Sequence, residues 1–294
     1  MEVCRVRTDL ALESAESVQG PKKEMNGVTM TEEYHADSDV TVTTVIVESK
    51  NASKRLGKPN GTYITLEAPS MHEDDEEYHR EISRELAACI GKLLPGKGKE
   101  LAILVVGLGN RAVTADSLGP LVIDNLHVTR HVLLEFGSAA YEGCATNMIS
   151  GIVPGVMART GMETMEIVKG VVESTNPDLI VAVDALAARS TRRLNRTIQI
   201  TNTGIHPGSG VGNHRGSLNQ ETLGKPVIAI GIPTVVDAAT IVNDAIGSKF
   251  EEIPLTNMAE LSNMYVTGKD IDETVKRLAY TISEGINMAL KYDR

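Results

Sequence analysis

Residues 101–120 read LAILVVGLGNRAVTADSLGP, a continuous apolar run that passes into a glycine-rich loop. Continuous apolar strands are typical of parallel sheets that are covered by helices on both faces. The runs LIVAV (179–183) and VIAIG (227–231) repeat this pattern, whereas TIQIT (197–201) alternates and indicates an edge or antiparallel strand. Helical stretches are expected between the strands, at 120–128 and about 163–174. The sequence therefore predicts an α/β fold, with a three-layer core around an open, mostly parallel sheet.

The first hundred residues have a different pattern. Residues 1–39 are polar and turn-rich, whereas alternating valines over 40–47 and the run TYITLE (62–67) predict two strands. The stretch KNASKRLGKPNG (50–61) between them is typical of a turn, so we expect a hairpin or meander. A helix should follow, from the acidic run at 73–77 to Leu93. Near the C-terminus, Asp270 and Glu273 form a D-x-x-E capping box ahead of a long amphipathic helix.

Composition excludes several classes of protein. The chain has 294 residues and a net charge of −10, so it is a poor candidate for direct nucleic-acid binding. It contains no uncharged apolar run near the roughly 18–20 residues of a membrane span, and no secretory signal is evident. Its three cysteines are far apart in sequence and form no CxxC pair. We therefore expect a cytoplasmic protein without a disulfide framework.

The loop at 107–120 formally contains the dinucleotide fingerprint G-x-G-x-x-[GA], over Gly107–Ala112. In a dinucleotide-binding unit the helix begins within the glycines, whereas Pro120 here predicts a helix start near Gly119. Nucleotide binding is therefore the weaker interpretation. Asp116 lies in this loop, at the end of a predicted strand where sites gather in open α/β sheets.

Two further loops contain candidate residues. Asp184 closes the apolar run in VDALAAR (183–189), where it could cap a helix that starts at Ala185 or could serve catalysis. His206 is the one histidine of the glycine-rich loop TGIHPGSGVGN (203–213), although a surface turn is the alternative there. Cys144 is a further candidate nucleophile, but a small, partly buried cysteine is the commoner case.

Two aspartates and a histidine at strand ends support two kinds of hydrolysis. Two neighbouring carboxyl groups can share one proton, so that one activates water while the other protonates the leaving group. Alternatively, Asp116, Asp184 and His206 could hold a divalent metal ion whose bound water attacks. The first mechanism needs no cofactor, and the sequence leaves both open.

Several long motifs resemble the spore germination protease family of endospore-forming bacteria. They occur in order along the chain: VRTDLALE (6–13), YITLEAP (63–69), GLGN and TADSLGP (107–120), VTRH (128–131), PGVMARTGMET (154–164), VDALAAR (183–189), TGIHPGSGVGN (203–213) and PVIAIGIPTVVDA (226–238). The final segment, NMYVTG onward, also looks like the end of that family. The chain departs in length, because only a short connection joins IVNDAI to NMYVTG where many relatives carry an insertion.

This resemblance implies an endopeptidase that begins the degradation of small acid-soluble spore proteins in the spore core during germination. It also implies a homotetramer made as a zymogen, which removes its own propeptide. The family's two proposed catalytic aspartates correspond to Asp116 and Asp184. The fold is expected to be similar to that of hydrogenase maturation proteases, whose loop motif corresponds to Gly107, Gly109, Asn110 and Gly119. In those relatives an acid, an Asp and a His bind nickel, which by analogy would involve Asp116, Asp184 and His206.

The family's substrates are cut after an acidic residue that is followed by an apolar residue, a small residue and, two places further on, another acid. Thr8–Glu13 reads TDLALE and places the predicted cut between Asp9 and Leu10, although Asp9 could instead cap a helix. We therefore expect a propeptide at 1–9, an N-terminal β-hairpin and helix extension at 10–100, and an α/β catalytic core at 101–294, the last two forming one compact unit. The alternative functions are a hydrogenase-maturation-type peptidase and a dinucleotide-dependent oxidoreductase that uses Gly107–Ala112.

Overall fold

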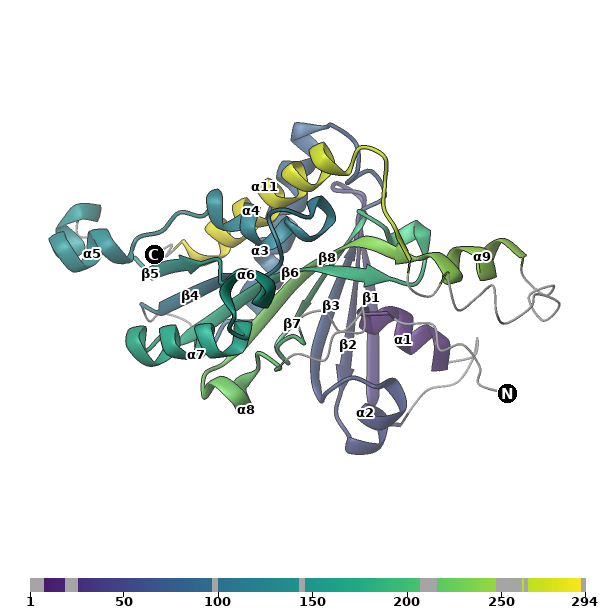
Figure 1. Ribbon diagram of the computed structural model, residues 1–294, viewed down its shortest axis with the longest axis horizontal. Helices are drawn as coiled ribbons and strands as arrows, with labels where there is room; N and C mark the ends of the chain where they lie inside the picture. The colour runs from purple at the N-terminus through teal and green to yellow at the C-terminus, as the bar shows by residue number, and fades with distance from the viewer. Residues whose placement is uncertain are drawn as a thin grey trace.

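The computed structural model describes residues 8–18, 26–96, 100–142, 146–206, 216–246, 261 and 264–291. Within these residues one sheet of nine strands runs through the molecule, in the order β1-β2-β3-β7-β8-β6-β4-β5, with β9 paired to β8 (Figure 1). The strands are β1 (Val28–His35), β2 (Val40–Val47), β3 (Gly61–Glu67), β4 (Ala102–Gly107), β5 (Met148–Ile152), β6 (Leu179–Ala188), β7 (Thr197–Thr201), β8 (Val227–Asp237) and β9 (Tyr265–Val266).

The parallel part of the sheet consists of β5, β4, β6 and β8. Residues of β4, β6 and β8 are buried on both faces, which explains the continuous apolar runs in the sequence. However, β6 and β8 run well past the predicted ends, because their pairing continues to Ala188 and Val236. Asp184 therefore lies within a strand, and the alternative of a helix starting at Ala185 is wrong.

The rest of the sheet is antiparallel, so the sheet as a whole is mixed, although the strands β4 to β8 of the predicted core are mostly parallel. Three of the eight strand pairings are parallel, and the other five are antiparallel. Strand β7 is antiparallel as expected, but it lies between β3 and β8 rather than at an edge. Through the β3–β7 pairing, the N-terminal strands β1 to β3 continue the central sheet instead of forming a sheet of their own.

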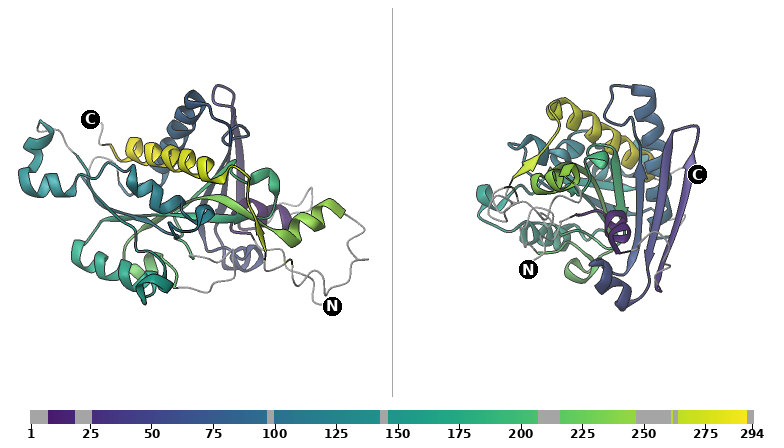
Figure 2. Two further views of the ribbon diagram at one scale, coloured as in Figure 1. Left: turned by 45° about the horizontal axis from the view of Figure 1, so that its top comes forward. Right: turned by 90° about the vertical axis from the view of Figure 1, so that its right-hand side faces the viewer.

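Helices cover the central strands on both faces, which confirms the three-layer core. One face carries α3 (Glu76–Leu93), α4 (Leu118–Asp124) and α11 (Ile271–Leu290), with Ile103, Val181 and Ile230 in the same apolar cluster as Ile282 (Figure 2). The other face carries α7 (Thr164–Thr175) and α8 (Gln220–Leu223), whose apolar side chains pack with those of β4 and β6. The two faces therefore bury alternate residues of the same strands.

The remaining elements are short helices around this core. They are α1 (Ala11–Val18), α2 (Lys50–Leu56), η1 (Thr114–Asp116), α5 (Arg130–Phe136), η2 (Gly137–Tyr141), α6 (Met157–Thr160), η3 (Thr191–Arg193) and α9 (Ala238–Ile246). No helix in the described part of the chain is long and apolar enough to cross a membrane.

Three local features differ from the sequence-based expectations, and the structure shows the local arrangement at each. The segment 50–61 contains helix α2 rather than turns alone, because the Ser49 hydroxyl accepts a bond from Ala52 N and Gly57 ends the helix at a φ of 67°. Residues 28–35 form strand β1 despite their polar composition, because β1 is an exposed edge strand. At the C-terminal helix Asp270 is the N-cap residue, but its side chain makes no capping bond.

The first prediction concerns Gly119, where loop and sheet backbones meet. A Cβ atom there would lie 2.3 Å from Leu108 O and 2.5 Å from Val183 O, and backbone atoms cannot give way as a flexible side chain can. We expect Gly119→Ala to lower the free energy of unfolding by about 3 kcal/mol or more. Chemical denaturation measures this loss.

Gly170→Ala is the matched control, because this exposed glycine lies within α7 and a Cβ there would meet nothing within 4 Å. It should raise the free energy of unfolding by about 0.5–1 kcal/mol. Equal stability of the two variants would contradict the steric role of Gly119.

Candidate active site

The loop after β4 is fixed against β6 by backbone contacts. Leu108 N donates to Val183 O at 2.8 Å, immediately before Asp184. Gly107 and Gly119 face each other so closely that a Cβ on Gly107 would lie 2.3 Å from Gly119 O. This packing explains why the sequence needs glycine at both positions.

The same loop is folded around Asp116, the last residue of η1. Asn110 N donates to Asp116 O at 2.8 Å, and the Asn110 side chain accepts a bond from Ala112 N. Gly109 has a φ of 115°, and a Cβ there would lie 2.0 Å from Asp116 O. Thr234 of β8 donates its hydroxyl to Ala115 O at 2.6 Å. Asp116 is thus held in a tight turn that packs against β6 and β8.

This geometry does not favour the dinucleotide interpretation. Helix α4 begins at Leu118, as the sequence indicated, and not within the glycines of 107–112. Arg111 turns back to bind both carboxylate oxygens of Asp124, at 2.5 and 2.6 Å. Hydrogen bonding by this guanidinium lowers the pKa of Asp124. The side chain of Arg111 therefore ties the loop to the end of α4.

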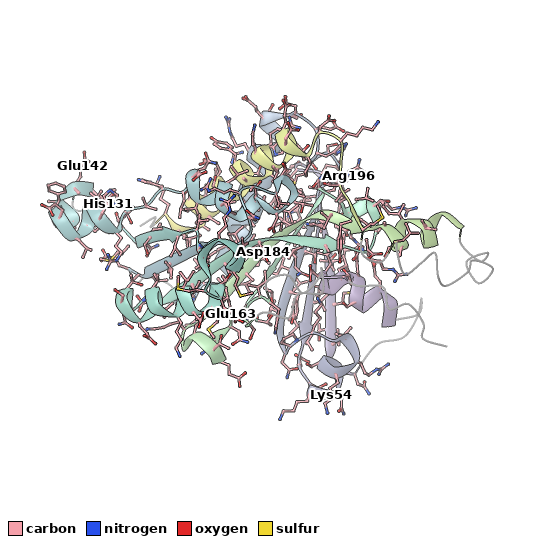
Figure 3. All side chains as sticks on the ribbon, viewed as in Figure 1. Lys54, His131, Glu142, Glu163, Asp184 and Arg196 are labelled. Atoms are coloured by element: carbon pink, nitrogen blue, oxygen red, sulfur yellow. The ribbon has the colours of Figure 1, made fainter. Side chains whose placement is uncertain are left out.

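Asp184 lies in the middle of the molecule (Figure 3), with 5% of its surface exposed. It is paired with Gly231 of β8, and its Oδ1 accepts a bond from Ala185 N at 3.0 Å. Asp184 lines an open pocket together with the exposed His206. Asp116 is not among the lining residues, although its turn contacts the strand that carries Asp184.

The metal interpretation finds no prepared ligand set. Within the described part of the chain, no three His, Cys, Asp or Glu side chains are grouped so that they could hold a metal ion. The residues Asp116, Asp184 and His206 thus do not form a metal-binding group as they are placed here. Cys144 lies outside the described residues.

The N-terminal segment enters the same pocket, because Asp9 is one of its lining residues. Asp9 N donates to Ala187 O at 3.1 Å, and Ala187 N donates to Asp9 Oδ2 at 2.9 Å. The carbonyl oxygen of Asp9 accepts bonds from Lys58 Nζ at 2.7 Å and from Gln199 Nε2 at 3.1 Å. Asp9, before the predicted cleavage site, and Asp184 therefore line the same pocket.

Glu13 anchors the residues that follow Asp9 in the N-terminal segment. Its side chain is 2% exposed, and its two oxygens accept bonds from Arg189 N at 2.7 Å and Ser190 N at 3.0 Å. The hydroxyl of Thr8 also donates to this carboxylate, and the guanidinium of Arg193 lies 3.5 Å away. Glu13 is thus a buried carboxylate with several charged or polar partners.

Lys58 and Arg193 contribute the positive charge around this segment. Burial lowers the pKa of Lys58, although the carboxylates of Asp9 and Glu13 act in the opposite direction. Burial also disfavours the charge of Arg193, but hydrogen bonds with Glu16 and Glu67 outweigh it, and the pKa of Arg193 is raised.

Sequence reasoning did not single out Lys58, Gln199 or Arg193. Lys58 lies in a stretch typical of a turn, and the alternation in TIQIT predicts a strand without distinguishing Gln199. The one available signal was Gln199, a large polar side chain between Ile198 and Ile200 in the middle of β7, where the structure buries it.

Comparisons with known proteins give a consistent result. Residues 6–254 match the sequence model of the family described as "Germination protease". A germination protease of Caldanaerobacter subterraneus is 43% identical to this chain, over 98% of this chain and 95% of the relative. One of Clostridium perfringens is 41% identical, over 97% of this chain and 95% of the relative. One of Bacillus cereus is 46% identical over 82% of this chain, which corresponds to 66% of that longer relative.

The second prediction concerns the anchor at Glu13. In Glu13→Gln, an amide NH₂ must face the backbone N–H of Arg189 or Ser190, so one of two donors loses its acceptor. We expect the free energy of unfolding to fall by about 1–3 kcal/mol. Hydrogen exchange at residues 8–18 should become faster. Denaturation and exchange mass spectrometry measure the two effects.

Glu16→Gln is the matched control, because the Glu16 side chain is 51% exposed and also pairs with Arg193. An exposed ion pair contributes only about 0–1 kcal/mol to the free energy of unfolding, so Glu16→Gln should lose no more than this. A larger loss in Glu16→Gln than in Glu13→Gln would show that the buried amide contacts are not the anchor.

Proposed function

Since the chain belongs to the germination protease family and is an endopeptidase, we propose that it initiates the degradation of small acid-soluble spore proteins in the spore core. The family relationship favours this function over a hydrogenase-maturation-type peptidase or an oxidoreductase. The loop at 107–112, with its late helix start, also gives the oxidoreductase no support.

The observation that carries this proposal is the position of Thr8–Glu13. This segment has the acidic, apolar, small and acidic pattern of the expected substrates, and its Asp9 lines the same pocket as Asp184. The chain thus holds a substrate-like sequence at its candidate active site. We take residues 1–9 as the propeptide of a zymogen and the Asp9–Leu10 bond as the one that it cuts.

The proposed chemistry uses one shared proton. One of Asp116 and Asp184 is ionised and removes a proton from water, which attacks the carbonyl carbon of the cut bond. The other is protonated and transfers its proton to the departing nitrogen. The products are a new carboxyl group and a new amine. Two carboxyl groups that share one proton resist ionising together, so the proposal predicts that mild acid favours the active, singly protonated pair.

Self-association as a homotetramer is part of the same proposal. Support comes from α5, where the large apolar side chains of Leu134 and Phe136 are 60% and 66% exposed. Apolar surface of this kind is typical of contacts between subunits.

The third prediction tests the two aspartates. Asp116→Asn and Asp184→Asn keep the side-chain shape but remove the ability to exchange the proton. We expect each to lower the rate of cleavage of a small acid-soluble spore protein by several orders of magnitude, with unchanged circular dichroism. Timed mass spectrometry of the digest measures the rate.

The same cleavage assay is used to test the wild type in EDTA and the His206→Ala variant. Since the described residues gather no three-ligand group, we expect the wild-type rate to survive EDTA and His206→Ala to retain activity. Strong inhibition in both cases would favour the metal-dependent mechanism.

For the aspartate prediction, near-full activity of a folded Asp116→Asn or Asp184→Asn variant would exclude that aspartate from catalysis.

The fourth prediction concerns self-processing. The full-length chain, incubated near pH 5–6, should lose residues 1–9 and acquire Leu10 as its N-terminus. Asp9→Ala should remain full-length, because it lacks the acidic side chain that Ala187 N holds. A chain that begins at Leu10 should be active without delay. N-terminal sequencing and intact-mass measurement follow the reaction.

The control is the Asp184→Asn precursor, incubated alone. If it is processed as fast as the wild type, or if the new terminus is not Leu10, the protein does not process itself at this site.

A further inference from the structure

The carbonyl oxygen of Asp9 has two side-chain donors, and neither comes from the segment itself. Lys58 follows α2 and Gln199 belongs to β7, yet both reach the same oxygen, at 2.7 and 3.1 Å. Such a carbonyl is strongly polarised, because one of its donors is an ammonium group.

Gln199 is oriented for this contact by a second hydrogen bond. Its Oε1 accepts a bond from Ala11 N at 2.6 Å, which turns its NH₂ group toward Asp9 O. Gln199 is 8% exposed, so water does not compete freely for the amide. One side chain therefore binds the backbone on both sides of the Asp9–Leu10 bond.

Lys58 is itself a lining residue of the pocket that contains Asp184. Lys58, Gln199 and Asp184 all line the cavity that Asp9 enters. Burial lowers the pKa of Lys58, which reflects an ammonium group partly removed from water. A partly desolvated charge interacts more strongly with a developing negative charge than an exposed one.

We propose that Lys58 and Gln199 form the oxyanion-binding pair of this peptidase, which receives the carbonyl oxygen of the bond that is cut. This inference rests on the proposed function, because it takes Asp9–Leu10 as a substrate bond. The same pair would receive the carbonyl of the acidic residue in a spore-protein substrate.

The pair acts at the step in which negative charge forms. Water adds to the carbonyl carbon and loses a proton to the ionised aspartate, while the C=O π electrons move to the oxygen. Lys58 and Gln199 bind the resulting oxyanion. When the C=O bond re-forms, the bond to Leu10 N breaks and that nitrogen takes the proton of the second aspartate. The electrons and protons balance without any further reactant.

The test compares Lys58→Met with Lys54→Met. Lys54 is an exposed lysine on α2 (Figure 3), so its variant controls for the loss of one positive charge in the same region. We expect Lys58→Met to slow processing at Asp9–Leu10 by about 10²–10³-fold, the usual cost of one oxyanion donor. Lys54→Met should process at the wild-type rate, and Lys58→Arg should recover part of the loss.

Gln199→Glu tests the second donor, because it keeps an acceptor for Ala11 N and loses the donor to Asp9 O. We expect Gln199→Glu to slow processing at Asp9–Leu10 by a similar factor. Each change is also introduced into the Asp184→Asn precursor, where melting temperatures show its effect on folding without processing.

A peptide of residues 5–18, RVRTDLALESAESV, is then cut by enzyme that begins at Leu10. Here the Lys58 and Gln199 changes should lower kcat far more than they raise KM, because the interaction strengthens in the transition state. A purely structural role would lower the melting temperature and leave kcat unchanged.

Two failures can be told apart. If the wild type cuts the peptide after its aspartate and the Lys58→Met and Gln199→Glu enzymes cut it with the same kcat, the oxyanion pair is wrong and the proposed function stands. If the wild type cuts neither its own chain nor the peptide nor a spore protein, the proposed function is wrong, and the pair with it.

Discussion

The close approach of the loop after β4 to β6 is the constraint on which the candidate site depends. Leu108 N bonds to Val183 O, and Gly119 packs on the same carbonyl with no room for a side chain. This contact places the Asp116 turn against the strand that carries Asp184. Since both sides of the contact are backbone atoms, the loop cannot shift relative to β6 without breaking it, and the proposed catalysis would depend on such a fixed arrangement.

The same strand arrangement also creates the binding site for the N-terminal segment. Because β4 ends at Gly107, opposite Val183, the residues of β6 beyond that point have no β4 partner. Backbone groups here bind the N-terminal segment: Ala187 of β6 binds Asp9, and Arg189 and Ser190, which follow β6, bind Glu13 through their amides. The end of β6 and the two residues after it thus bind Asp9 and Glu13, the two acids on either side of the proposed cleavage site.

The predictions that held share a local cause. The runs at 101–106, 179–183 and 227–231 are strands because residues buried on both faces must be apolar throughout, and that requirement is visible in any window. The late start of α4 follows from Pro120 in the same way. The errors have a non-local cause. Strand β7 is interior because β3 pairs with it from more than a hundred residues away, and Asp184 stays in a strand because β8 continues beside it.

The sequence alone predicted an α/β chain with a three-layer core, the loops that carry Asp116 and His206, and the position of Asp184 after an apolar run, while the family resemblance marked Thr8–Glu13 as substrate-like. Short-range patterns suffice for the strands and loops, because burial and turn chemistry act within a few residues. Only the tertiary structure brought Asp9, Lys58 and Gln199 together, from an N-terminal segment, a helix end and a strand. Lys58 and Gln199 are ordinary polar residues in their local sequence, and their proposed role arises from the carbonyl oxygen that they share, which no local pattern records.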